Sequence, residues 1–254
     1  MPSPLQFMQR YRQLQVNVIE DDDVAQMCRE VPRTISVRKY FMMNWREGTD
    51  QRTDFNFMTR GGRRHRWYQS HKEQIKTAAM GKGSPSDYER ALEWAVISGK
   101  IASPTQVNIQ TFCDNRLGID CSGFATNYLI ACGKKPNTPS TARNTNAASY
   151  FSAANAVNDP NDVRQGDLLV WMEGNSVKRG PGHIAVVQSY VAQSTPGGNM
   201  RVCEATGAAA ANPKLLDSMY EVEEILDPQR GRSTMILVVK RHGHSGSRVA
   251  VIRP

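Results

Sequence analysis

The spacing of apolar residues predicts a helix and several short strands in the second half of the chain. Residues 121–131 carry Phe124, Tyr128 and Leu129 on one helical face, and Gly133 is suited to end that helix. Apolar runs predict strands at 183–190, 201–205 and 235–239. We therefore expect helix and sheet together in this half.

An earlier helix is expected from Pro85 to about Gly99. Proline suits the first turn of a helix, and Ser86 and Glu89 have the spacing of a capping box. We expect this helix to pack on the domain that holds the predicted strands. Its apolar face consists of Leu92, Ala95 and Val96.

Cys121 stands where the second helix begins. Asp120 is a good N-cap residue, so the thiol falls in the first turn, where the helix dipole favours a thiolate. Gly123 lets a substrate backbone approach closely, and the first-turn amides could stabilise an oxyanion. This setting predicts that Cys121 is a nucleophile.

His183 is the candidate base for this thiol. Pro181-Gly182 interrupts the chain before the apolar run, so the imidazole is expected at a strand end. A third group should orient the imidazole and support its charged form. Glu204 is the first acidic residue after the histidine strand, and Asp167 and Gln188 are weaker candidates.

Four segments, in this order, resemble motifs of the NlpC-type papain-like cell-wall peptidases. Asp120-Cys121-Ser122-Gly123-Phe124 resembles the nucleophile motif, and residues 141–144, with Arg143, supply the family's basic residue. Residues 163–171 resemble its Gly-Asp strand, and residues 182–187 its histidine strand. An acidic third residue such as Glu204 is closer to the sister CHAP amidases.

The resemblance covers about residues 85–240 and implies an α+β papain-like fold, with N-terminal helices packed on a central antiparallel sheet. It also implies a cysteine hydrolase that cleaves amide bonds in peptidoglycan stem peptides through Cys121, His183 and Glu204. No cofactor or metal is expected. Arg143 is either a ligand for a substrate carboxylate or a solvated loop residue.

The chain departs from the family just before the nucleophile. Many NlpC-type members carry a tyrosine and paired glycines there, whereas residues 106–117 of this chain have neither. A further oxyanion donor would then come from Gln110, Asn108 or Asn115.

The resemblance suggests a domain division. Residues 1–84 form an N-terminal extension of unknown role or an integral part of the fold, and 85–241 form the catalytic domain. Residues 242–254 are expected to be a tail, although 249–252 could add a strand.

Composition fits an anionic partner. The 32 Lys and Arg against 24 Asp and Glu give a net charge of +8, which suits cell wall, nucleic acid or an acidic membrane surface. No apolar run reaches membrane-spanning length. Five scattered cysteines without a CxxC pair predict free thiols rather than disulfides or a zinc site.

Other function classes remain open. The basic, aromatic segment at residues 60–68 could bind nucleic acid by phosphate contacts and stacking, with Cys121 a structural thiol, but it leaves the four motifs unexplained. An inactive fold used as an adhesion module is a second alternative. A third is the same catalyst acting on host proteins or acyl-thioesters.

Residues 1–8 lack a basic region followed by an apolar stretch, so we expect no secretory signal. A wall hydrolase made in the cytoplasm would then reach the periplasm or cell wall of a target cell by a specialised route. Type VI-like antibacterial effectors and phage lysins are the analogous cases, and a delivery or immunity protein would be a partner.

Overall fold

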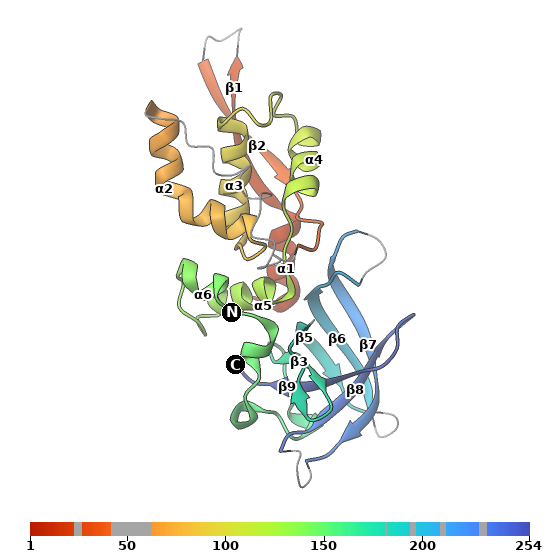
Figure 1. The fold of residues 1–254 in the computed structure, drawn as a ribbon. Helices are drawn as coiled ribbons and strands as arrows, with labels where there is room; N and C mark the ends of the chain where they lie inside the picture. Colours follow the sequence, from red (N-terminus) through yellow and green to blue (C-terminus); the bar gives the residue numbers. More distant parts are fainter. Residues whose placement is uncertain (23–26, 42–61, 181, 194–196, 209–211, 229–232) are drawn as a thin grey trace. The chain divides into compact units, whose positions relative to one another are not determined.

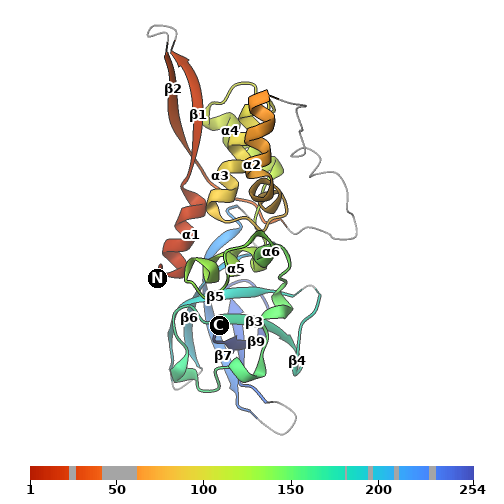
Figure 2. The same cartoon turned by 90° about the vertical axis from the view of Figure 1, so that its left-hand side faces the viewer.

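The computed structural model describes residues 1–22, 27–41, 62–180, 182–193, 197–208, 212–228 and 233–254. The chain forms two compact units. The barrel unit contains Met1–Met8, Cys121–Ala209 and Leu215–Pro254, and the helical unit contains Gln9–Asp120 and Ala210–Lys214. Figures 1 and 2 show the elements of both.

Strands dominate the barrel unit. In order of pairing they are β4 (Ser176–Val177), β3 (Leu168–Glu173), β5 (Ile184–Val191), β6 (Gly198–Ala205), β7 (Leu215–Leu226), β8 (Ile236–Arg241) and β9 (Ser247–Ile252). β9 also pairs with β3, so six antiparallel strands of the described chain close into a barrel, drawn in cyan to blue in Figure 1.

Alternation along the strands explains the barrel interior. Alternate residues of β3 and of β5 to β9 supply most of one shared apolar core, because side chains of a strand point alternately to its two faces. The buried members of this core are Val157, Leu169, Ala185, Val187, Met200, Val202, Tyr220, Val222, Met235, Leu237, Val239, Val249 and Val251.

Helices cover part of the outer surface of the barrel. α5 (Cys121–Ala131) contacts β5 and β6, and the 3-10 turn η2 (Ala147–Tyr150) contacts β3. The outward residues Ile184 and Val186 are therefore buried as well. Phe7, near the start of α1 (Pro4–Arg12), packs its ring 5.9 Å from Phe124 and 5.8 Å from Tyr128. The remaining short elements are α6 (Pro139–Arg143), η3 (Ala153–Asn155) and η4 (Pro160–Asp162).

The predicted papain-like fold, with helices packed on a central antiparallel sheet, is wrong. The sheet is a closed six-stranded antiparallel barrel accompanied by a few helices, within the residues described. Closure depends on β9, which pairs Ala250 with Ile236 on one side and Ile252 with Leu168 on the other. The prediction treated residues 242–254 as a tail that could add a strand at 249–252, but it did not pair that strand with both edges of the sheet.

The described part of the helical unit contains the end of α1, a long hairpin and three further helices. β1 (Leu14–Asp22) and β2 (Met27–Ile35) pair antiparallel, and α2 (Gly62–Ala79), α3 (Pro85–Ile97) and α4 (Gln106–Arg116) follow. The capping box of α3 is formed by Ser84 and Asp87, two residues before the predicted pair. None of the helices in the described residues is both long and apolar enough to cross a bilayer.

The two units do not follow the predicted ranges of 1–84, 85–241 and 242–254. α3 and α4 lie in the helical unit, while residues 1–8 lie in the barrel unit. In the predicted tail, the strand that the sequence allowed at 249–252 is present within β9.

Candidate active site

Where the apolar core ends, the next inward-facing positions of the strands carry polar side chains. His183 continues the inward series of Ala185 and Val187, and Glu204 continues that of Met200 and Val202. The same alternation adds further residues to this face. They are Trp171 on β3, Ser218 and Tyr220 on β7, and Arg241 on β8.

His183 and Glu204 form the centre of this cluster. His183 Nε2 lies 2.6 Å from Glu204 Oε2, a charge-assisted hydrogen bond when the ring is protonated. The Glu204 side chain is 1% exposed and the imidazole 17%. The carboxylate that the sequence named as partner of His183 is thus in contact with the ring.

Glu204 is held by donors on both carboxylate oxygens. Oε1 accepts hydrogen bonds from Ser218 Oγ at 2.6 Å, Tyr220 OH at 3.1 Å and Arg241 Nη1 at 3.1 Å. Burial would raise the pKa of Glu204, but His183, Ser218 and Arg241 outweigh it and lower the pKa below its usual value. The carboxylate is therefore ionised and fixed in orientation.

Cys121 is the other partner of the imidazole. Burial lowers the pKa of His183, but hydrogen bonds and charge interactions with Cys121 and Glu204 outweigh it and raise the pKa to about 10. Since Nε2 faces Glu204, Nδ1 is the ring nitrogen left for the thiol. Cys121 is the first residue of α5 and is 5% exposed. The three predicted catalytic residues thus form one chain of contacts.

Trp171 and Gly182 also hold His183 in place, although neither belongs to the Cys121–His183–Glu204 series. The Trp171 and His183 rings meet edge to face with centroids 4.5 Å apart, and Trp171 N donates to the carbonyl of His183 at 3.1 Å. A Cβ on Gly182 would lie 2.6 Å from the Lys178 carbonyl oxygen, so only glycine fits before the histidine. Pro181 lies outside the described residues.

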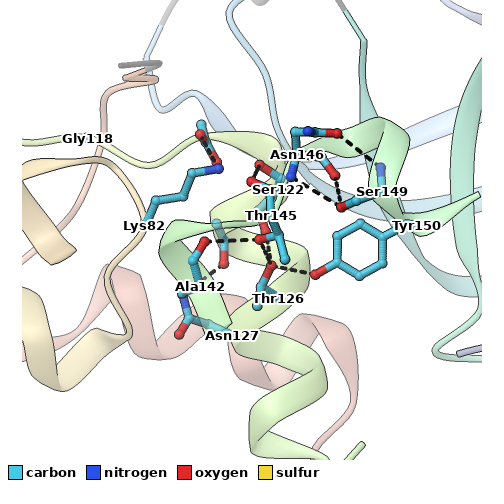
Figure 3. A network of polar contacts seen from close by, with 12 residues as sticks. Lys82, Gly118, Ser122, Thr126, Asn127, Ala142, Thr145, Asn146, Ser149 and Tyr150 are labelled. Carbon is cyan, nitrogen blue, oxygen red and sulfur yellow. Dashed lines mark hydrogen bonds and ion pairs between the residues drawn. The ribbon is translucent and has the colours of Figure 1, made fainter. Parts of the chain in front are cut away.

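A hydroxyl network anchors the first turns of α5 (Figure 3). Thr126 Oγ1 lies 2.6 Å from the Ser122 carbonyl oxygen, 2.7 Å from Thr145 Oγ1 and 2.5 Å from Tyr150 OH. Ser122 Oγ donates to the Thr145 carbonyl at 3.3 Å. These contacts tie the residue after Cys121 to Thr145 and Tyr150, in the segment that follows α6. Arg143 ends α6 and is half-buried.

The two weaker candidates for orienting His183 are engaged elsewhere. Asp167 accepts from Arg164 N at 2.9 Å and from the Arg253 guanidinium at 3.1 and 3.2 Å. Gln188 Oε1 accepts from Leu5 N at 2.9 Å. Asp167 is therefore a structural residue at the start of β3.

The three candidate oxyanion donors lie on α4 in the helical unit. Gln110 Nε2 donates to the Ser36 carbonyl at 2.8 Å and to Asp114 at 3.0 Å, and Asn108 Nδ2 donates to the Ser103 carbonyl at 2.8 Å. Asn115 lines a surface cavity of about 510 Å³ together with Asn108. Hydrogen bonds within the helical unit thus engage two of the three amides.

Four cysteines have described side chains, and none of these four forms a disulfide. Cys113 is fully buried on α4, and burial, followed by Asp114, raises the pKa of its thiol. Cys132 follows the C-terminal end of α5, and Cys203 is buried on β6. Within the described residues no group of His, Cys, Asp or Glu side chains has a metal-binding arrangement.

Sequence reasoning missed Ser218, Tyr220, Arg241 and Trp171. A signal was present for the first three, because each occupies an inward position of its strand, where a polar side chain needs a partner. This signal depends on which segments form strands and which face of each strand points inward, and the sequence alone did not establish either for these three residues.

The chain was compared with protein-family models, curated proteins and solved structures, and none of them matches it.

Proposed function

We propose that the protein is a cysteine hydrolase in which Cys121 is the nucleophile, His183 the acid and base, and Glu204 the residue that orients His183. One observation carries the proposal: the imidazole contacts the Cys121 thiol and, through Nε2, the buried Glu204 carboxylate at 2.6 Å. A nucleophile, a base and an orienting group in series are the elements of thiol catalysis.

Acylation uses the proton that His183 holds. The Cys121 thiolate attacks the carbonyl carbon of an amide, and the first-turn amides of α5 stabilise the oxyanion. The imidazolium gives its proton to the amide nitrogen, the C–N bond breaks, and the amine leaves. The product is a thioester on Cys121 and a neutral imidazole hydrogen-bonded to Glu204.

Deacylation reverses the roles. Neutral His183 takes a proton from water, and the hydroxide attacks the thioester carbonyl. The C–S bond breaks, the carboxylic acid product leaves, and the thiolate–imidazolium pair is restored. His183 must therefore lose and regain one proton in each cycle, beside a carboxylate that stays charged.

The proposed substrate is the amide bond of a peptidoglycan stem peptide. The support is the order of the nucleophile, Gly-Asp and Gly-His segments in the sequence, together with the net charge of +8, which suits an anionic polymer. Delivery to a target cell wall by a specialised route, with a delivery or immunity protein, belongs to the same proposal.

Digestion of purified peptidoglycan, with products identified by mass spectrometry, tests the proposal. We expect new amine and carboxyl termini at one type of amide bond, and none with Cys121→Ala. If peptidoglycan stays intact while a protein or thioester library is cleaved, the same catalytic residues act on another substrate. No thiol-dependent hydrolysis of any of these would refute the proposal.

The nucleic-acid alternative loses support at its aromatic residues. Trp67 stacks on Trp94 and His71 with ring centroids 5.8 and 4.3 Å apart, and Tyr68 is buried against Trp94. Tyr68 and Trp94 are buried in the helical unit and Trp67 is half-buried against Trp94, so these rings are poor platforms for bases. Residues 60–61 and the side chains of 62–65 lie outside the described part.

A further inference from the structure

Arg241 is the second cation on the Glu204 carboxylate. Its Nη1 donates to Oε1 at 3.1 Å, whereas His183 occupies Oε2 at 2.6 Å. The Arg241 side chain is 14% exposed, so its charge is only weakly screened by water. Arg241 is the last residue of β8 and pairs across the sheet with Tyr220 of β7.

The two cations differ in one chemical property. A guanidinium keeps its charge at every pH at which the protein is folded, whereas an imidazolium can release its proton. If His183 were the only counter-charge, loss of its proton would leave an uncompensated carboxylate in the interior, which costs several kcal/mol. The imidazole would then retain its proton and could not act as a base.

We propose that Arg241 is a positioning residue that serves as the permanent counter-ion of Glu204, so that His183 can lose and regain its proton during turnover. This inference rests on the proposed function for its role in turnover, but its electrostatic part concerns the free protein. Arg241 does not touch the reacting atoms and acts through Glu204.

The groups around this pair are few. Glu204 faces His183 at the start of β5, Ser218 and Tyr220 of β7, and Arg241 of β8. His183 faces Cys121 of α5 as well. Arg241 Nη2 also lies 3.0 Å from Nε2 of His244. Glu204 is the carboxylate shared by both cations, so removal of Arg241 leaves His183 as the counter-charge of Glu204.

The test titrates the His183 ring by NMR in the Cys121→Ala protein, where thiol ionisation does not contribute. Arg241→Gln should raise the pKa of His183 by about one unit or more, as expected for loss of a cation close to a paired carboxylate. Arg241→Lys keeps the charge and should stay within a few tenths of a unit of the parent.

Arg201→Gln is the matched control. Arg201 also pairs with a strand carboxylate, Asp217, but the pair lies at the surface, so its loss should leave the His183 titration unchanged. A folded Arg241→Gln protein with the parent titration would overturn the inference. If Arg241→Gln does not fold, Arg241→Met at the same site is titrated in its place, and a titration equal to the parent's overturns the inference equally.

A second measurement addresses turnover. With Cys121 present, Arg241→Gln should slow deacylation more than acylation, so that the thioester accumulates in a burst experiment, and Arg241→Lys should restore the parent ratio. A raised His183 pKa in a protein that hydrolyses nothing would reject the proposed function and keep the electrostatic inference. Normal hydrolysis without any change in pKa would reject only the inference.

Discussion

Glu204 Oε2 lies 2.6 Å from His183 Nε2, and the glutamate is the more deeply buried of the two side chains. A buried carboxylate reduces stability unless its lone pairs are satisfied, and apolar replacements of buried ion pairs are often neutral or stabilising. Here Ser218, Tyr220 and Arg241 satisfy the remaining positions. Several donors surround one carboxylate at the end of an apolar core. This arrangement fits a Glu204 that serves His183 rather than the stability of the fold.

The first prediction concerns the nucleophile. Cys121→Ala should lower amide hydrolysis by at least about a thousandfold, because acyl transfer needs the thiolate, and should leave the unfolding midpoint nearly unchanged. Release of peptidoglycan fragments measures the activity. Cys132→Ala, just beyond the other end of α5, is the control and should stay active. Loss of activity in Cys113→Ala or Cys132→Ala, with Cys121→Ala active, would contradict the assignment.

The second prediction concerns the imidazole. His183→Ala should remove activity as completely as Cys121→Ala, and the double variant should be little worse, because the two groups act as one unit. Alkylation of Cys121 by iodoacetamide at pH 7 should slow about tenfold or more, since the imidazolium no longer favours the thiolate. Peptide mapping by mass spectrometry follows each cysteine. An unchanged rate at Cys121 would show that the imidazole does not support the thiolate.

The third prediction concerns Glu204. Glu204→Gln should lower turnover by about 10-fold to 100-fold, less than the 10²–10⁴ that a general base contributes, because an amide oxygen still accepts the His183 bond. Glu204→Ala should be worse, since the ring loses its orienting partner. Gln188→Ala, which removes only the bond from Leu5 N, is the control. Full turnover in a folded Glu204→Ala protein would leave a Cys121–His183 dyad.

The fourth prediction concerns stability and pH. The folded-state pKa of His183 is raised from 6.5 to about 10, so its contribution is fully present below pH 6.5 and is lost as pH rises toward 10. The pKa of Glu204 is lowered from 4.5, so its contribution is present above pH 4.5 and is lost on acidification. The pair therefore stabilises the barrel unit most between about pH 4.5 and 6.5.

Urea unfolding at a series of pH values measures this effect. The free energy of unfolding of the parent should fall between pH 6.5 and 10, and His183→Ala should flatten that part of the curve. His71→Ala, which changes a ring of the helical unit, should keep the parent slope. Equal slopes in the parent and His183→Ala would mean that His183 keeps an ordinary pKa.

Local patterns predicted α3, α5 and most strands of the barrel, but not β7, α4 or the elements before α3, and long-range pairing decided the fold. The helix from Cys121 to Ala131 was predicted with both ends correct, because its signals lie within and directly beside the segment. Closure of the barrel joins Ile252 to Leu168, which are far apart in sequence. No local pattern encodes such a pairing, and β9 has the same composition as a terminal strand of an open sheet.

The site divides in the same way. Cys121 was predicted from its place at a helix start, and His183 from the Gly-His pair at a strand start. Glu204 was predicted because the next strand was expected to pair antiparallel with the histidine strand. Arg241 has no such flank, because Lys240-Arg241 at the end of an apolar strand resembles any solvated strand end. Its inward position depends on the register of β7 with β8, which pairs Tyr220 with Arg241.

The last prediction concerns Gly166, in the turn before β3. Its φ of +89° is unfavourable for other residues, and a Cβ there would lie 3.0 Å from the Tyr128 hydroxyl on α5. Gly166→Ala should therefore destabilise the barrel unit by about 1–2 kcal/mol from the backbone alone, and by more from the contact. Gly174→Ala is the control, since its φ of +60° carries a similar backbone cost and nothing lies within 4 Å of its Cβ.

Urea unfolding should show a larger loss of unfolding free energy for Gly166→Ala than for Gly174→Ala. Combination of Gly166→Ala with Tyr128→Phe should recover only the excess over Gly174→Ala. Equal losses at both glycines would mean that Tyr128 moves aside without cost, and that the turn and α5 are not tightly packed.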